Sequence, residues 1–363
     1  MPDHKKWMKA ALALAKRGLG SVAPNPSVGC LIVKDDILIG RGWTKPGGRP
    51  HAETCALEFA GEAAKGATAY VTLEPCSHIG ETPPCAEALI AAGIKQAVVA
   101  IEDPDPRVSG RGIAALRNAG IPTTVGVMEA EAHKVNAGFF LKNIASRPLF
   151  TLKIAGSLDG KIATSSGESK WITAQKSRDY GHLVRAQHDA ILVGINTVIA
   201  DNPTLTCRIE GLECKSPVAV VLDSRLRIPL DCQLVRKAEE RPLYIVCNEA
   251  AIESDTARKL TAAGACLLAV PDTRDINSIG KRLAKQGFTR VLVEGGGQVL
   301  ASFVAARHCD SLLVFTAGKI IGADGLPSMG PLALAHLGDA PHLTLEGYRK
   351  LGPDLLATYS NAE

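Results

Sequence analysis

The stretches His51-Ala52-Glu53 and Ala69-Tyr70-Val71-Thr72-Leu73-Glu74-Pro75-Cys76 decide the fold of the first half of this chain. His51 opens a segment with helical spacing, and Pro75-Cys76 follows a strand-like run of apolar and β-branched residues. Cys85 comes after eight intervening residues, where the next helical segment begins. Two expected helix starts and one expected strand end therefore each carry a side chain that can bind a metal.

The donor set of His51, Cys76 and Cys85 suits Zn²⁺, because one imidazole and two thiolates are borderline-soft ligands. Three protein ligands leave a fourth position for water, whose pKa the metal lowers to about 7. Glu53 lies on the same helical turn as His51 and can shuttle protons between that water and a substrate. The order His-x-Glu, then Pro-Cys, then Cys is typical of zinc deaminases, in which the glutamate is not a ligand.

Two features of this pattern leave alternatives open. Zinc deaminases usually separate the two cysteines by two residues, whereas eight residues separate Cys76 from Cys85. The two cysteines could instead be buried thiols and His51 a helix-capping residue. We expect the zinc site, because the complete ordered set is much less common by chance than any one of its members.

Two polar residues near this set are expected to hold the substrate. His78 lies in the loop between the cysteines, and we favour substrate contact there, since a fourth protein ligand would close the metal site. Asn25, within Pro24-Asn25-Pro26, is a turn residue by composition, and its amide could instead bind substrate.

Outward from this centre, the chain alternates between strands and helices, which predicts layered α/β units. In residues 1–146 we expect strands at 28–33, 37–40, 69–73, 97–101 and near 125, and helices at 7–17, 51–65, 84–92 and after Gly110. In residues 147–363 we expect strands at 149–154, 190–193, 218–222, 243–247, 290–294 and 311–315, and helices at 176–187, 255–263 and 276–286.

The second half carries weaker chemical signals. Val291 to Gln298 is a strand that leads into three glycines and then an apolar helix, an arrangement that can bind phosphate at a helix N-terminus but is also an ordinary turn. It lacks the spacing of a Rossmann fingerprint. Trp171 could belong to the core, although its expected loop position suits a flat ligand.

Composition limits the classes of protein to consider. The 363 residues are 46% hydrophobic and 21% charged, with a formal net charge of +4, which predicts two folded domains and excludes a disordered chain. The mild charge and 4% aromatic content argue against a nucleic-acid partner. No apolar run could span a bilayer or act as a signal peptide, so we expect a cytoplasmic protein without membrane partners, in which ten cysteines are free thiols or metal ligands.

The motifs of the first half resemble the deaminase part of the bifunctional riboflavin-biosynthesis deaminase–reductases. The similarity lies in Pro24-Asn25-Pro26-x-Val28-Gly29, His51-Ala52-Glu53, Thr72 to His78 with Thr82-Pro83-Pro84-Cys85, and Asp103-Pro104-Asp105-Pro106 with Gly110-Arg111-Gly112. The long cysteine loop is similar to that family and unlike cytidine or tRNA-adenosine deaminases. The resemblance implies a cytidine-deaminase-like three-layer α/β/α domain over residues 1–146.

The resemblance continues through Lys153 to Lys161, Ser166 to Thr173, Thr197 to Arg208, Leu222-Asp223-Ser224 and Glu294-Gly295-Gly296, where the family often has Glu-Ala-Gly. It implies a dihydrofolate-reductase-like α/β domain over residues 147–363 that uses NADPH. By resemblance, the cofactor would contact Ala155, Trp171, Thr197, Asp201, Ser224 and the loop formed by Gly296, Gly297, Gln298, Val299, Leu300, Ala301 and Ser302. The substrate would contact Ser169, Arg185, Leu205, Arg208 and Glu294.

The two arginines in this substrate set suit a phosphorylated sugar, because guanidinium pairs bidentately with phosphate, although lone arginines are more often surface ion pairs. Lys153 or Asp201 is expected to assist proton delivery, and Arg225 or Arg227 to neutralise the 2′-phosphate of NADPH.

The implied function is a two-step synthesis. Zinc-dependent hydrolysis would deaminate 2,5-diamino-6-(5-phosphoribosylamino)pyrimidin-4(3H)-one, and NADPH would then reduce the ribosyl group to ribityl. We also expect a homo-oligomer. The rival hypotheses are a nucleic-acid base deaminase with an accessory domain, and a second half that binds nucleotide without turnover.

Overall fold

The computed structural model describes residues 3–77, 83–105 and 109–361. Contacts along the chain divide it into two compact units, residues 1–146 and 147–363. Within the described residues, no helix combines the length and the apolar character that crossing a membrane requires.

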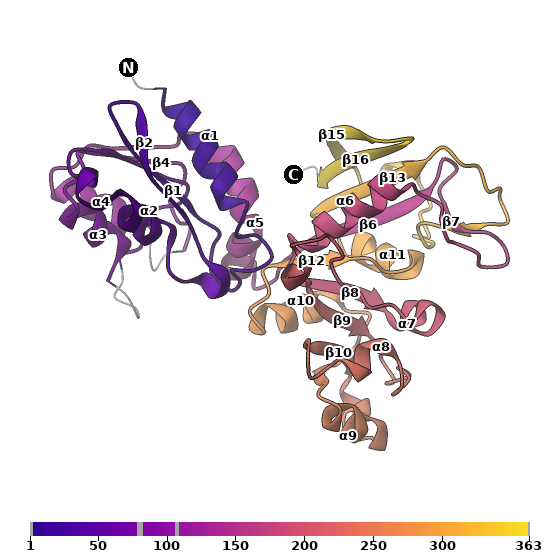
Figure 1. Ribbon diagram of the computed structural model, residues 1–363. Helices are drawn as coiled ribbons and strands as arrows, with labels where there is room; N and C mark the ends of the chain where they lie inside the picture. The colour runs from indigo at the N-terminus through magenta and orange to yellow at the C-terminus, as the bar shows by residue number, and fades with distance from the viewer. Residues whose placement is uncertain (1–2, 78–82, 106–108, 362–363) are drawn as a thin grey trace. The chain divides into compact units, whose positions relative to one another are not determined.

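The first unit is built on one five-stranded mixed sheet in the order β2-β1-β3-β4-β5 (Figure 1). Strand β1 is antiparallel to both β2 and β3, whereas β3, β4 and β5 are parallel. The strands are β1 (Gly29–Lys34), β2 (Ile37–Trp43), β3 (Thr68–Val71), β4 (Gln96–Val99) and β5 (Thr123–Val125). The helices are α1 (His4–Ala15), α2 (Ala52–Ala60), α3 (Cys85–Ala91), α4 (Arg111–Asn118) and α5 (Glu129–Ala145).

Glycines let helices approach both faces of this sheet closely. A Cβ at Gly29 would lie 2.0 Å from the carbonyl oxygen of Ala11 in α1, and a Cβ at Gly42 would lie 2.2 Å from that of Ala52 in α2. Gly42 pairs with Cys30, the neighbour of Gly29, so the two glycines point to opposite faces. The result is three layers, with α1 and α5 on one side and α2, α3 and α4 on the other (Figure 1), and the predicted α/β/α architecture is confirmed.

One element of this unit is absent from the sequence-based expectation. The alternating pattern ends at the strand near Val125, but the seventeen-residue helix α5 follows it. Its buried side chains include Val135 and Phe140, and the Asn136 amide hydrogen-bonds both backbone groups of Ser27. This helix therefore anchors the segment that carries Asn25.

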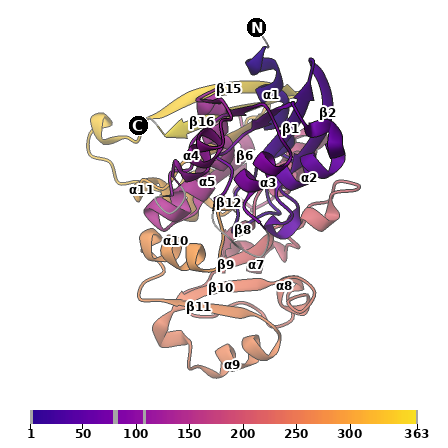
Figure 2. The same cartoon turned by 90° about the vertical axis from the view of Figure 1, so that its left-hand side faces the viewer.

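The second unit contains a nine-stranded sheet in the order β11-β10-β9-β8-β12-β6-β13-β16-β15. Figure 2 shows β12, β8, β9, β10 and β11 following one another. All neighbours from β11 to β13 are parallel, and β13, β16 and β15 are antiparallel. The main strands are β6 (Leu149–Ser157), β8 (Ala190–Gly194), β9 (Val218–Leu222), β10 (Leu243–Asn248), β11 (Cys266–Val270), β12 (Arg290–Val293), β13 (Ser311–Ala317), β15 (Leu343–Leu351) and β16 (Asp354–Asn361), and β7 (Lys161–Ala163) pairs with β14 (Leu326–Pro327).

Helices cover both faces of the parallel part of this sheet. Helices α10 (Ile276–Lys285) and α11 (Gly297–Ala305) pack on one face, where Phe303 meets Phe150 edge to face at 4.8 Å. Helices α6 (Gln175–Arg185), α7 (Ile195–Asp201), α8 (Gln233–Arg236) and α9 (Asp255–Ala262) contribute to the core on the other face. All six strands and three helices predicted for this half are present, and β11 and the β15–β16 hairpin are additional.

Burial of His188 predicts a loss of stability in acid. Its ring nitrogens lie 2.7 Å from the Val184 carbonyl oxygen and 2.9 Å from Thr151 Oγ1, and burial lowers its pKa from 6.5 to about 3. His188 therefore becomes protonated near pH 6.5 in the unfolded chain but stays neutral in the folded chain. As a result, the free energy of unfolding falls as the pH falls from 6.5 towards 3. This group contributes about 2 kcal/mol of that loss between pH 6.5 and pH 5.

This contribution is measured by urea unfolding of two proteins, one with His188 and one with His188→Gln. In both, Trp7 and Trp43 are replaced by Phe, so that the fluorescence of Trp171 reports unfolding of the second unit. The wild type should lose more stability on acidification than the variant. Equal losses would show that His188 does not titrate as its burial predicts.

Candidate active sites

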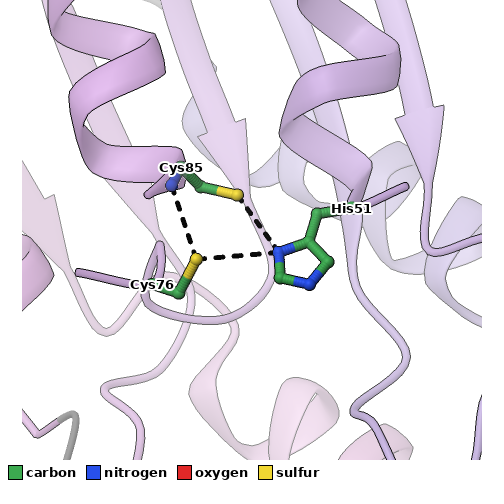
Figure 3. A group of neighbouring side chains, drawn as sticks. All are labelled: His51, Cys76 and Cys85. Carbon is green, nitrogen blue, oxygen red and sulfur yellow. Dashed lines mark hydrogen bonds between the residues drawn. The ribbon is translucent and has the colours of Figure 1, made fainter. Parts of the chain in front are cut away.

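The three predicted metal ligands lie together in the first unit (Figure 3). His51 immediately precedes α2, Cys76 lies in the loop after β3, and Cys85 is the first residue of α3. His51 Nδ1 lies 3.2 Å from Cys85 Sγ and 3.6 Å from Cys76 Sγ, and all three donor atoms are within 4.8 Å of one another. The eight-residue separation is therefore no obstacle, because the chain returns to the same point before α3 begins.

The alternative role of His51 as a helix-capping residue does not fit the geometry. His51 occupies the N-cap position of α2, but its side chain makes no capping hydrogen bond and points to the cysteines. The Cys85 backbone N–H donates to Cys76 Sγ at 3.4 Å, and hydrogen bonds from Cys85 and His51 lower the pKa of the Cys76 thiol. Among the residues that the structure describes, three donors gather here, and a thiolate beside an imidazole and a second sulfur fits a catalytic zinc ion.

Glu53 lies in the first turn of α2, two residues after His51, and is buried. Burial raises the pKa of this carboxyl group from 4.5 to about 7, and the nearby charge of Cys76 adds to the effect. A carboxyl group with a pKa near neutrality can both accept and release a proton under physiological conditions. This is the property that proton transfer in hydrolysis requires.

A cavity of about 560 Å³ opens onto these residues. Asn25 lines it as predicted, together with His51, Glu53 and Cys76, whereas His78 lies outside the described residues. The lining also includes polar, charged and aromatic residues that have no role in the sequence-based prediction: Arg49, Asp103, Asp105, Arg111, Phe139, Lys142 and Asn143. The last three come from α5, and the apolar spacing of residues 129–145 is the signal that could have revealed them.

Glu74 fixes one wall of this cavity. Its buried carboxylate accepts hydrogen bonds from the backbone N–H groups of Asp103, Gly110, Gly112 and Ile113, at 2.7–3.2 Å. Charge-assisted hydrogen bonds of this kind are among the stronger ones in proteins. Glu74 therefore positions the backbone at Asp103 and at residues 110–113 beside the cavity.

The second unit contains a buried charge cluster at the carboxyl end of β12. Arg185 Nε and Nη2 each lie 2.8 Å from a carboxylate oxygen of Glu294, and Lys153 Nζ lies 3.5 Å from the same carboxylate. Burial alone would raise the pKa of Glu294, but the charges of Arg185 and Lys153 hold it well below its ordinary range. The Glu294 carboxylate thus stays ionised and fixes the orientation of both cations.

A second cavity, of about 310 Å³, surrounds this cluster and brings together seven of the predicted contacts and the predicted proton donor Lys153. These seven are Ala155, Ser169, Trp171, Arg185, Asp201, Arg208 and Glu294. His182, which had no predicted role, also lines the cavity. Its Nδ1 lies 3.2 Å from the Thr206 carbonyl oxygen, and burial together with the charges of Arg185 and Arg208 lowers its pKa.

Trp171 lies in the loop before α6, and its side chain is 58% exposed. Of its two possible roles, core residue or flat ligand face, the exposed position agrees with the second. The Arg178 guanidinium lies 4.5 Å from its ring centroid and supports one face.

The remaining predicted contacts lie outside this cavity. Thr197, Ser224 and the segment from Gly296 to Ser302 do not line it, and Leu205 is buried in the core. The expected loop from Gly296 is in fact the N-cap and first turns of α11, in which the side chains of Leu300 and Ala301 pack into the core. These two side chains, like that of Leu205, are buried. Arg225 and Arg227 are both exposed.

Comparison with known proteins identifies the family. Residues 148–357 match the RibD C-terminal domain, and residues 1–101 match the cytidine and deoxycytidylate deaminase zinc-binding region. The riboflavin biosynthesis protein RibD of Aquifex aeolicus is 44% identical over 97% of both chains. The chain belongs to the RibD family. The RibD of Escherichia coli is 39% identical over 96% of this chain and 97% of its own.

Solved RibD structures share the complete architecture. RibD of Acinetobacter baumannii superimposes with a TM-score of 0.89 at 37% identity, and each chain covers 99% of the other. A deaminase/reductase from Thermotoga maritima has a TM-score of 0.87 at 36% identity, again over 99% of both chains. The predicted family and fold are therefore confirmed. As a RibD protein, the chain is a bifunctional deaminase and reductase of riboflavin biosynthesis, with a zinc-binding deaminase domain and an NADPH-using reductase domain.

Proposed function

We propose that residues 1–146 deaminate 2,5-diamino-6-(5-phosphoribosylamino)pyrimidin-4(3H)-one, here called the diamino ribotide. Residues 147–363 then reduce the product, 5-amino-6-(5-phosphoribosylamino)uracil, here called the uracil ribotide. The similar Thermotoga maritima protein is a diaminohydroxyphosphoribosylaminopyrimidine deaminase and 5-amino-6-(5-phosphoribosylamino)uracil reductase. The observation that carries the proposal is the convergence of His51, Cys76 and Cys85 on the cavity that contains Glu53.

In the deaminase unit, His51, Cys76 and Cys85 would hold zinc, which when bound makes water nucleophilic at neutral pH. Glu53 takes a proton as water adds to the ring carbon that bears the amino group. Glu53 then returns a proton to the departing nitrogen, the C–N bond breaks, and ammonia leaves. Asn25 lines the same cavity and orients the ring through its side-chain amide, and His78 is the second proposed substrate contact.

In the reductase unit, NADPH when bound supplies a hydride, and the protein positions the ribosyl carbon that receives it. Arg185 and Arg208 line the cavity and would pair with the phosphate, while Ser169 and Glu294 hold polar groups of the ligand. Lys153 and Asp201 are the proposed sources of the proton that completes the reduction. Full turnover by Lys153→Met would exclude the lysine.

The remaining proposed contacts act in different ways. Leu205 would serve through its backbone groups, since its side chain is buried. Leu300 and Ala301, whose side chains pack into the core, would act by holding the first turns of α11 in place. Gly296 at the N-cap of α11 offers the free backbone N–H groups of a helix start to a cofactor phosphate.

The deaminase proposal is tested by measuring ammonia release from the diamino ribotide with NADPH omitted. Stoichiometric ammonia is expected, and cytidine at the same concentration should release none. Deamination of cytidine, or no ammonia from the ribotide, would contradict the proposed substrate.

We propose further that the protein works in the cytoplasm as a homo-oligomer. Its ten cysteines are all free, as a reducing compartment favours. Leu345 and Tyr348 of β15 and Leu355 of β16 lie on one face of the sheet and are 44–77% exposed. An uncovered apolar sheet face is typical of an interface, and a second copy of this chain is the partner we propose.

A Leu345→Glu, Tyr348→Glu double variant should therefore have a lower molar mass than wild type in size-exclusion chromatography with light scattering. Leu337→Glu is the matched control, because Leu337 is 92% exposed and lies outside the β15–β16 hairpin, in the short 3-10 helix Leu337–Asp339. A monomeric wild type, or an unchanged mass in the double variant, would refute this interface.

A further inference from the structure

A third cavity, of about 320 Å³, lies in the second unit and shares no lining residue with the reductase cavity. We call it the Arg241 pocket. Apolar side chains such as Leu234 and Leu243 line it, and Arg241, Lys237, Thr204 and Thr206 do so as well. Its volume is at the lower end of the range for small-molecule sites.

Arg241 is the unusual member of this pocket. Its Nη1 atom is buried and has no hydrogen-bond partner among the residues that the structure describes. Burial and the positive charge of Arg185 lower the pKa of Arg241, so its guanidinium is unfavourably placed as the chain stands. A buried guanidinium nitrogen without a hydrogen-bond partner is unfavourable, and an anion in the pocket would supply the missing acceptor.

The other polar groups of the pocket define the anion that would fit. Lys237 supplies a second, exposed cation. Thr204 Oγ1 and Thr206 Oγ1 are 3.1 Å apart, so one hydroxyl donates to the other and the second hydroxyl proton is left for a ligand. Glu213 and Glu240, both exposed, also line the pocket and can accept hydrogen bonds from hydroxyl groups.

We propose that the Arg241 pocket binds a small phosphate monoester with hydroxyl groups, at a site separate from both active sites. The phosphate lies against Arg241, Lys237 and the threonine pair, and the hydroxyl groups face Glu213 and Glu240. A guanidinium group and an ammonium group match the double negative charge of a phosphate monoester.

This site adjoins the reductase machinery through one residue. The Thr206 side chain lines the Arg241 pocket, while its carbonyl oxygen accepts a hydrogen bond from Arg185 Nη1 at 2.9 Å. A ligand that holds Thr206 therefore acts on the residue that orients Arg185.

Cys214 gives a local test, because it is exposed and lines the Arg241 pocket but not the reductase cavity. Alkylation of the full-length protein by iodoacetamide is followed site by site by mass spectrometry, with inorganic phosphate or with chloride at equal ionic strength. At a phosphate concentration about ten times the Kd, the fraction of protein with an empty pocket falls about tenfold. The alkylation rate of Cys214 should fall by about the same factor. Cys266, exposed on β11 and outside the pocket, is the internal control and should react at an unchanged rate.

Arg241→Met should abolish the protection of Cys214, and Lys237→Met, which leaves the buried residues in place, should weaken it. Arg236→Met is the matched control, since Arg236 is exposed on the same helix and does not line the pocket. An equal Cys214 rate with and without phosphate would overturn the proposal. Full protection in both Arg241→Met and Lys237→Met would overturn it as well, and if Arg241→Met fails to fold, the Lys237→Met result decides.

Discussion

Glu53→Gln is expected to lower the rate of ammonia release by about a hundredfold to ten-thousandfold, the usual contribution of general acid–base catalysis. Glutamine has nearly the shape of glutamate but cannot take up or release the proton. Because Glu53 is not one of the three grouped metal ligands, zinc should remain bound at one equivalent per chain. Reduction of the uracil ribotide by the second unit should be unaffected.

Glu58→Gln is the matched control for this variant. Glu58 lies on the same helix, α2, but is exposed and does not line the cavity. Its replacement should leave deamination unchanged. Metal analysis and ammonia assays on both variants separate loss of the metal from loss of proton transfer, and substantial deamination by zinc-loaded Glu53→Gln would remove Glu53 from the mechanism.

Arg185→Met is expected to have the largest effect on the second unit. It breaks a two-point ion pair with Glu294, whose side chain is only 9% exposed, and leaves a buried carboxylate with Lys153 as its remaining partner. Removing one partner of a buried pair typically lowers the free energy of unfolding by about 3–5 kcal/mol, and a loss of that size is expected here. The proposed phosphate contact is lost at the same time, so the KM for the uracil ribotide should rise by at least about tenfold.

A double variant distinguishes these two effects. Arg185→Met combined with Glu294→Leu removes both buried charges, so most of the lost stability should return, as it does when buried pairs are replaced by apolar residues. Reductase activity should not return, because both residues line the reductase cavity. Recovery of activity together with stability would show that the pair is structural and does not hold substrate.

The zinc site could be predicted from the sequence because its members follow local rules. A histidine at a helix start, a cysteine after a strand and a cysteine at the next helix start are local positions, and the structure brings their donor atoms together. The strand pattern was equally local, since buried parallel strands such as β8 and β9 are nearly continuous apolar runs.

The walls of the deaminase and reductase cavities could not be predicted in this way, because they depend on contacts between segments that are distant in the sequence. Glu74 holds backbone groups of Asp103 and Ile113, far along the chain, and Lys142 reaches the deaminase cavity from a helix that the strand–helix alternation did not reveal. His182 looks like any polar residue of an amphipathic helix until α6 is packed beside Thr206. Leu300 shows the opposite difficulty, since the resemblance assigns it to the cofactor without distinguishing side chain from backbone, and the structure buries its side chain.

The most direct test of the complete account measures NADPH oxidation by native and zinc-depleted protein with each of the two ribotides. With the diamino ribotide, oxidation should require zinc, because the reductase unit receives its substrate only after deamination. With the uracil ribotide, oxidation should proceed at the same rate with and without zinc. NADPH oxidation by zinc-depleted protein supplied with the diamino ribotide would contradict the proposed order of the two reactions. Zinc dependence with the uracil ribotide would contradict the assignment of the two activities to separate units.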